Sequence, residues 1–271
     1  GNIGDQFCYE TEEVVVSTDS FDFSDFLEIR WLSLFFNTIF LIGWYRDFFQ
    51  FVRSCGIPVA DFLLAFIGSN SQKQRQTAHT RFITNFETAV KGELFSSEQD
   101  VGNHLQEIFF KNNNDVAKPA RHNVYYGARL CYIECDWIPT ALWDTFLLLA
   151  GPDVDLEVAK ALIDVGAVER VDLFNPEIPV SIPINFDIVK WRRDKYRKSI
   201  KDYAIDTVML EFYLKPSLES KRCDLVKDVG SMLERDEFYY TAVDFINPRS
   251  DLLFGLEIKK TILKKHLDSQ V

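Results

Sequence analysis

The sequence predicts a mainly α fold, a globular bundle of several helices with a few short strands near residues 13–18 and 207–214. Three observations support this prediction. Apolar residues recur at helical spacing through much of the chain, and glycine and proline account for only 12 and 9 of the 271 residues. Phenylalanine is abundant, at 24 residues. Because each buried aromatic side chain removes roughly 150–250 Å² from water, such a chain can hold large helical faces together.

The composition excludes several classes of protein. With 47% hydrophobic and 26% charged residues, the chain is neither collagen-like nor a low-complexity disordered protein. It carries 41 acidic and 30 basic residues, a net charge of −11, so we expect neither nucleic acid nor a membrane as a partner. The five cysteines are an odd number without a repeated spacing, which predicts packed thiols in a reducing, cytoplasmic environment.

We expect no signal peptide at the start of the given sequence, because residues 1–6 lack both a basic region and an apolar core. The chain opens with Gly1 rather than with methionine. We therefore expect either that Gly1 is a cloning remnant or that the chain is cut from a longer protein.

The first expected elements are a strand and a long buried helix. The β-branched run at residues 13–18 predicts the strand or, alternatively, an extended entry segment. The uncharged stretch at residues 31–45 is 15 residues long, shorter than the roughly 20 residues that span a bilayer, so we interpret it as a buried helix. Ser24 is expected to cap the N-terminus of this helix, Gly43 to interrupt it, and Gly56 to end its second half.

The middle of the chain predicts a series of further helices. Each is recognised by apolar residues at helical spacing or by a capping residue at its start. They are a short helix from Pro58 to about residue 67, a helix through residues 82–90 that stops near Gly92, a helix opened by a capping box at residues 97–100, two pieces between residues 117 and 150 that are separated near Pro139, and a short helix at residues 153–165.

The C-terminal part differs from what precedes it. Three prolines within residues 174–186 predict an extended segment, and we place a boundary there between a helical lobe at residues 1–175 and a smaller α+β lobe at residues 176–271. We expect the two lobes to pack as one compact body. The smaller lobe is predicted to contain a basic helix at residues 186–201, the strand at residues 207–214, a helix opened by residues 216–217 and a helix at residues 252–266.

Cys131 and Cys135 form the one close cysteine pair in the sequence and are weak candidates for metal ligands. At a spacing of four residues on a helix, both thiols would lie on one face. A tetrahedral zinc site needs four ligands, and the sequence has no second cysteine pair and no close histidine pair. We therefore favour two core thiols. We expect neither a metal site nor a catalytic residue in this chain.

Residues 190–198 are the densest cluster of positive charge, with six basic residues and one acidic residue in nine positions around Trp191 and Tyr196. On a helix these charges spread around most of the circumference, which is typical of a solvated surface with Trp191 turned inward. The alternative is a patch that faces a phosphate or a nucleotide-linked substrate. The candidate substrate- or phosphate-facing residues are Lys190, Arg192, Arg193, Lys195 and Arg197.

Two stretches of the sequence carry a resemblance to a known family. The first begins with E-V-V-V-S-T at residues 13–18 and runs through residues 30–45. The second contains I-N-F-D-I-V-K-W at residues 184–191, S-I-K-D-Y at residues 199–203 and M-L-E-F-Y-L at residues 209–214. In order and rough spacing, both resemble the region that follows the catalytic barrel in cobalamin-binding-type radical SAM proteins, where the segments read E-V-V-x-T, F-x-Y-D-I-V-x-W, S-D-Y and Y-E-F-Y-F.

The resemblance implies an accessory role rather than catalysis. Members of this family hold a [4Fe–4S] cluster on a C-x-x-x-C-x-x-C motif, cleave S-adenosylmethionine to a radical, and often bind cobalamin. In this chain the pair Cys131 and Cys135 has no third cysteine, and the sequence contains neither the glycine-rich SAM segment nor the cobalamin motif. The resemblance therefore implies a non-catalytic C-terminal domain that covers the barrel and helps to select the substrate. Its partner would be the missing barrel in cis, and the three cofactors would belong to the parent protein.

Two other interpretations remain open at this point. The chain could be a stand-alone helical domain whose aromatic grooves bind a protein partner, in which case it would need no upstream residues. It could also be an independent enzyme, which would require a pocket with convergent titratable groups. The sequence shows no set of titratable residues that would converge in such a pocket.

Overall fold

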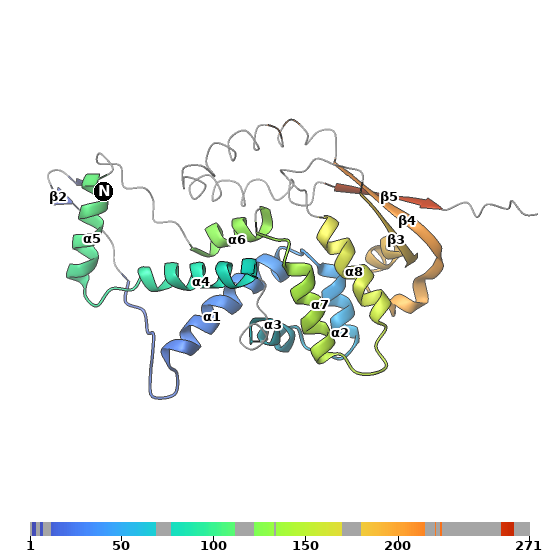
Figure 1. Cartoon of the computed structure of the whole chain (residues 1–271), viewed down its shortest axis with the longest axis horizontal. Coiled ribbons are helices and arrows are strands. Elements are labelled where there is room, and N and C mark those ends of the chain that lie inside the picture. Colours follow the sequence, from blue (N-terminus) through green and yellow to red (C-terminus); the bar gives the residue numbers. More distant parts are fainter. Residues whose placement is uncertain are drawn as a thin grey trace, which may run out of the picture.

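The mainly α prediction is confirmed by a computed structural model, which describes residues 2–3, 6–7, 12–68, 77–111, 122–132, 134–169, 180–214, 220, 223 and 256–262 (Figure 1). The α-helices are α1 (Phe23–Phe35), α2 (Arg46–Ser54), α3 (Val59–Gly68), α4 (Thr77–Gly92), α5 (Glu98–Lys111), α6 (His122–Tyr132), α7 (Ile138–Leu149), α8 (Leu156–Glu169) and α9 (Ile188–Arg193). A π-helix, η1 (Phe36–Leu41), and a 3₁₀ helix, η3 (Ile200–Tyr203), complete the helical elements of the described part. The strands are β1 (Asn2–Ile3), β2 (Gln6–Phe7), β3 (Val180–Phe186), β4 (Ala204–Leu214) and β5 (Leu256–Ile262).

The strand predicted at residues 13–18 is wrong. Residues 12–17 form no regular secondary structure, and the side chains of Val14 and Val15 are 53% and 69% exposed. A β-branched run favours an extended backbone, but a strand also needs a neighbouring strand to pair with. In the described part, this segment makes only the isolated bridge between Thr18 and Phe21.

The N-cap of α1 is Asp22, so the predicted cap at Ser24 is two residues too late. One oxygen of the Asp22 carboxylate accepts hydrogen bonds from the backbone N–H groups of Ser24 at 2.7 Å and Asp25 at 3.0 Å. The Asp25 carboxylate accepts from the Asp22 N–H at 2.9 Å and closes a capping box. A carboxylate upstream of Ser24 therefore takes the capping position.

The uncharged stretch is buried helix and is interrupted where predicted. α1 continues into η1, and the chain then turns at Gly43, which has a φ of +87°. α2 follows and ends at Gly56, whose φ is +80°. No single helix of the described residues is long and apolar enough to cross a membrane, and the segments Phe23–Leu41 and Arg46–Ser54 pass that test only as a pair bent by 102°.

The predicted middle helices are present as α3 to α8, with small shifts at their ends. Ser97 accepts a hydrogen bond from the Asp100 N–H at 3.2 Å and opens α5 as expected. The helix predicted at residues 153–165 begins later, at Leu156, because Asp155 caps it by accepting from the Val158 N–H at 3.2 Å.

The core between these helices is built from aromatic rings. Phe48 of α2 meets Phe62 of α3 and Phe146 of α7 edge to face, with centroids 5.6 Å apart in both pairs. Trp31 of α1 packs on Phe86 of α4 with centroids 4.6 Å apart. Such pairs add stability beyond the buried area, which explains the abundance of phenylalanine in the sequence.

The C-terminal sheet is antiparallel, with the order β3-β4-β5, and lies at one end of the molecule beside α8 (Figure 1). The strand predicted at residues 207–214 is confirmed as the central strand β4.

The helix predicted at residues 252–266 is wrong over its described part, because Leu256–Ile262 is β5 and pairs with β4. In Leu256–Ile262 apolar residues occupy mostly alternate positions, a period-two pattern that suits a strand once a partner is available. The boundary proposed near residue 175 lies outside the described residues, as does the start of the helix expected from residues 216–217, of which Ser220 and Cys223 are described and helical.

The basic helix predicted at residues 186–201 is wrong in its extent. α9 covers only Ile188–Arg193, and Lys195 and Tyr196 then take left-handed conformations with φ of 56° and 59°. The indole N–H of Trp191 donates to the Lys198 carbonyl at 3.0 Å and holds the chain in this turn. This hydrogen bond from the Trp191 side chain therefore helps to end the helix at a point where the sequence has no glycine or proline.

Candidate functional site

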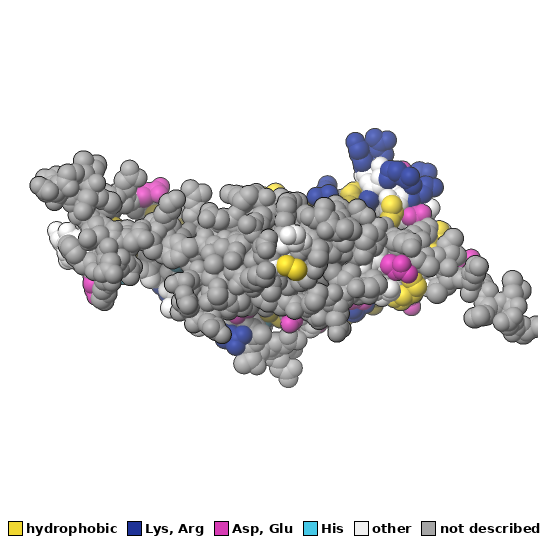
Figure 2. Space-filling view, turned by 90° about the horizontal axis from the view of Figure 1, so that it is seen from above, with side chains coloured by type: hydrophobic (Ala, Val, Ile, Leu, Met, Phe, Trp, Pro, Cys, Tyr) yellow, Lys and Arg dark blue, Asp and Glu magenta, His cyan; other side chains and the backbone are white. Residues whose placement is uncertain are grey.

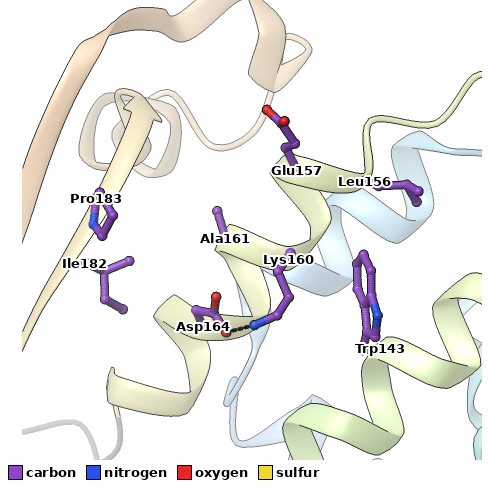
Figure 3. A pocket seen from close by; sticks show the side chains of 8 residues that line it. All are labelled: Trp143, Leu156, Glu157, Lys160, Ala161, Asp164, Ile182 and Pro183. Carbon is purple, nitrogen blue, oxygen red and sulfur yellow. Dashed lines mark hydrogen bonds and ion pairs between the residues drawn. The ribbon is translucent and has the colours of Figure 1, made fainter.

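A pocket of about 440 Å³ lies between α7, α8 and β3 (Figure 3). Its wall is largely apolar, and three charged side chains of α8 contribute to its lining. The lining residues are Trp143, Leu156, Glu157, Lys160, Ala161, Asp164, Ile182 and Pro183.

Helical spacing explains how α8 supplies one side of the pocket. Glu157, Lys160, Ala161 and Asp164 are three or four residues apart and so share one helix face. The Lys160 ammonium forms an ion pair with the Asp164 carboxylate, drawn as a dashed line in Figure 3. The lining contains no histidine, cysteine, serine, threonine or tyrosine. This arrangement suits the binding of an apolar or aromatic group, and it holds no nucleophile with an adjacent base.

The sequence analysis did not identify this pocket. Its residues come from three separate segments, and none of them forms a local motif. The exposed faces of α7 and α8 are ordinary in composition. The pocket is therefore recognisable only in the folded structure, where β3 packs against α8.

The structure separates the five predicted basic residues into two groups. Arg192 turns inward, where its Nε donates to Asp47 Oδ2 at 2.9 Å and its Nη2 lies 2.5 Å from Glu169 Oε1. The hydroxyl of Tyr196 donates to Asp47 Oδ1 at 2.9 Å. We call these four residues, Asp47, Glu169, Arg192 and Tyr196, the anchor cluster. The other predicted residues, Lys190, Arg193, Lys195 and Arg197, are exposed and remain together on the surface.

The sequence analysis missed the two carboxylates of the anchor cluster. Asp47 is only 3% exposed, and in the sequence it stands among the aromatic residues of a strongly amphipathic helix. A charged residue on the apolar face of such a helix was the available signal, because a buried charge requires a partner. Its partner Arg192 is 145 residues away and could not be identified from local spacing.

The groups of the anchor cluster perturb each other's pKa. Burial disfavours the charge on Arg192, but the carboxylates of Glu169 and Asp47 outweigh it and raise the pKa of the guanidinium. Burial raises the pKa of Tyr196, and the neighbouring Asp47 carboxylate raises it further. For Glu169, burial raises the pKa to about 7, because the attraction of Arg192 is weaker than burial and is opposed by Asp47.

The raised pKa of Glu169 predicts that stability falls as the pH rises. In the folded state the group retains its proton up to about pH 7, whereas the ordinary pKa of a glutamate carboxyl is 4.5. The folded state therefore binds more protons between these values, and its extra stability is lost as the pH passes through 7. We expect the free energy of unfolding to fall by about 3.5 kcal/mol across this range, since one pKa unit corresponds to about 1.4 kcal/mol.

Urea unfolding of the wild type and of Glu169→Gln across this pH range measures the effect. The Gln variant should lose most of the pH slope, whereas Glu157→Gln, on an exposed part of the same helix, should keep it. An unchanged slope in Glu169→Gln would show that another group is responsible.

The cysteine pair is buried but does not share a helix face. Cys131 lies in the last turn of α6, which ends at Tyr132, and Cys135 lies beyond the helix. The predicted common face is therefore wrong, while the predicted burial is confirmed, with exposures of 1% and 5%. Among the described residues, no group of three or more His, Cys, Asp or Glu side chains is placed to hold a metal ion.

Comparison with known proteins adds no relative. No protein family, no curated protein and no solved structure matches the chain. Function is therefore inferred from the contacts of the chain's own residues and from the resemblance of its two stretches.

Proposed function

We propose that this chain is a non-catalytic accessory domain of a radical SAM enzyme, which covers the mouth of the catalytic barrel and helps to select the substrate. One observation supports this more than any other. The two stretches that resemble such a region, residues 13–45 and 184–214, are far apart in the sequence, and Asp47, two residues after the first stretch, is bonded to Arg192 and Tyr196 of the second.

The first stretch ends against α8 and the anchor cluster. The indole N–H of Trp44 donates to the carbonyl of Gly166 at 2.9 Å, and this bond is buried. Asp47, two residues beyond the stretch, accepts hydrogen bonds from Arg192 and Tyr196, which both lie within the second stretch. Through Asp47, the segment that follows the first stretch is therefore tied to the second stretch, as a domain that docks in one orientation requires.

In the second stretch, the residues that carry the resemblance also make the contacts that stabilise its local structure. The Asp187 side chain caps α9 by accepting from the Lys190 N–H at 3.0 Å, and the Asp187 N–H donates to the Tyr203 carbonyl at 2.8 Å. Trp191 is 2% exposed and anchors the Lys198 carbonyl. The motif residues therefore shape the unit of β3, α9, η3 and β4, which agrees with a structural role.

The first stretch also exposes apolar side chains that a barrel would cover. Ile29 is 54% exposed, and Phe36, seven residues further along the continuous helix of α1 and η1, is 37% exposed. A separation of seven residues places both on about the same side of the helix. The Phe36 ring also packs on Phe40, with centroids 5.2 Å apart. We infer that this helix side contacts the barrel.

The residues of this chain do not fit the iron–sulfur cluster of the family. Cys131 and Cys135 are both buried, and the third position of the C-x-x-x-C-x-x-C motif is the fully buried Ile138. We therefore assign the [4Fe–4S] cluster, S-adenosylmethionine and cobalamin to the rest of the parent protein.

The first test is to read the coding DNA upstream of Gly1. The proposal expects an open frame of several hundred codons that includes a C-x-x-x-C-x-x-C motif. A start codon immediately before Asn2 would overturn it and would leave the stand-alone interaction domain as the better interpretation.

The second test compares this chain with the product of the complete reading frame by hydroxyl-radical footprinting. We expect Ile29 and Phe36 to be oxidised several-fold more slowly in the longer protein, because the barrel covers them. Phe95, in the loop between α4 and α5, and Leu148 of α7 are 37% and 67% exposed; they are the internal controls and should react equally in both proteins. Equal oxidation of all four side chains would contradict the proposed contact.

A further inference from the structure

A cluster of positive charge stands out on an otherwise acidic chain. Residues 190–201 contain seven basic residues and one acidic residue, a net charge of +6, so the rest of the chain carries −17. Arg192 is neutralised in the anchor cluster. The other six cations are exposed and form what we call the basic surface: Lys190, Arg193, Lys195, Arg197, Lys198 and Lys201.

Within the described part of the chain, the cations of the basic surface remain available to a partner. Among the described residues, none of them lies within ion-pair distance of a carboxylate. The nearby Asp194 accepts a hydrogen bond from the Tyr203 hydroxyl at 2.9 Å instead. Figure 2 shows lysine and arginine side chains projecting together at one edge of the molecule. Like charges held together in this way create a positive potential that attracts anions.

The backbone beneath the basic surface is held in place from inside. Tyr196 packs edge-on against Trp191 with centroids 4.7 Å apart, and its hydroxyl is bound by Asp47. Lys195 and Tyr196 keep left-handed conformations that non-glycine residues seldom adopt. Such backbone strain persists only where the surrounding contacts impose it. The cations therefore stand on a preformed turn, which lowers the entropic cost of binding.

The same contacts argue against three kinds of anionic ligand. Single-stranded nucleic acid needs aromatic rings for base stacking, but Trp191 is buried and the Tyr196 hydroxyl is held by Asp47. Membrane insertion uses several large apolar side chains, and only Val189 is an exposed large apolar residue on α9. A backbone site for a single phosphate needs unused N–H groups, whereas those of Lys195 and Tyr196 donate to carbonyls of α9.

We propose that the basic surface docks an aspartate- and glutamate-rich segment of another protein. Carboxylates spaced along an extended segment can each meet a separate lysine or arginine without a common pocket, and lysine acts as a compact point charge in such contacts. This inference does not depend on the radical SAM proposal, since an accessory domain and a stand-alone domain could both use the surface.

Binding of fluorescein-labelled decaglutamate, followed by fluorescence anisotropy at low salt, tests the proposal. We expect the double variant R193E/K198E to bind the peptide at least about tenfold more weakly, a loss of roughly 1.4 kcal/mol. The matched control R53E/K91E replaces one exposed arginine and one exposed lysine on other helices and changes the net charge equally. It should stay within about twofold of the wild type, because the lost attraction is local.

Three results would overturn the proposal. The first is an equal loss of affinity in both variants, and the second is no binding of decaglutamate to the wild type. The third is that the wild type binds oligothymidylate or phosphatidylserine vesicles more tightly than decaglutamate and that R193E/K198E removes this binding. The neutral variant K190Q/R193Q is measured in parallel, and it should weaken decaglutamate binding even if the reversed charges prevent folding. The footprinting of Ile29 and Phe36 is independent of this assay, so failure of either proposal is seen separately.

Discussion

Replacing Asp47 by alanine is expected to lower the free energy of unfolding by about 3–5 kcal/mol, the range seen when one partner of a buried ion pair is removed. Asp47 is 3% exposed and accepts hydrogen bonds from both Arg192 and Tyr196. Without it, Glu169 is the one charged partner that the Arg192 guanidinium keeps among the described residues, and the Tyr196 hydroxyl loses its acceptor. The turn that carries the basic surface would also lose its anchor.

Urea unfolding of Asp47→Ala against the wild type measures this loss. Asp144→Ala, which removes an exposed carboxylate on α7, should change the free energy by no more than about 0.5 kcal/mol. The triple variant D47L/E169M/R192M should recover much of the loss, because it removes all three charges together and apolar residues of similar volume often replace buried ion pairs without cost. A loss below about 1 kcal/mol in Asp47→Ala would mean that solvent reaches Arg192 and Tyr196.

Replacing Gly166 by alanine is expected to destabilise the protein by about 1–3 kcal/mol, the usual cost of overpacking a core. A Cβ atom at this position would lie 2.3 Å from Cδ1 and 2.8 Å from Cε1 of the Tyr45 ring. Tyr45 is 1% exposed and cannot swing into solvent. Any shift of α8 to relieve the clash would disturb the hydrogen bond from Trp44 to the Gly166 carbonyl.

The sign of the stability change in Gly166→Ala distinguishes an overpacked contact from an open one. In an open helix, alanine is more favourable than glycine by about 1 kcal/mol, so an unobstructed Gly166→Ala would stabilise the protein. Gly92→Ala is the matched control, because nothing lies within 4 Å of the added Cβ atom in α4. Thermal unfolding should therefore show a lower midpoint for Gly166→Ala and an equal or higher midpoint for Gly92→Ala. A raised midpoint for Gly166→Ala would show that the helices separate easily at this contact.

Several features of the fold were predictable because their causes are local. The break at Gly43 and the end of α2 at Gly56 follow from glycine's access to positive φ. The start of α5 follows from an N-cap at Ser97, whose hydroxyl accepts from the Asp100 N–H and donates to the Asp100 carboxylate within four residues. The inward position of Trp191 follows from the contrast between one large apolar ring and the charges around it.

Other features depended on partners that are distant in the sequence. The run at residues 13–18 has the composition of a strand but has no paired neighbour in the described part, whereas Leu256–Ile262 becomes β5 because β4 offers an edge. The pocket exists only where α7, α8 and β3 meet. The local sequence pattern does not specify these contacts, because strand pairing and pocket formation depend on which distant segments the fold brings together.

The sequence by itself determined the mainly α class, the buried uncharged helix and the concentration of basic residues at 190–201. Only the tertiary structure decided that Arg192 belongs to the interior and its neighbours to the surface. The physical reason is that a buried carboxylate requires a charged partner, and Asp47 finds that partner 145 residues further along the chain. One long-range ion pair thus divides a continuous basic run into an anchor and a binding surface.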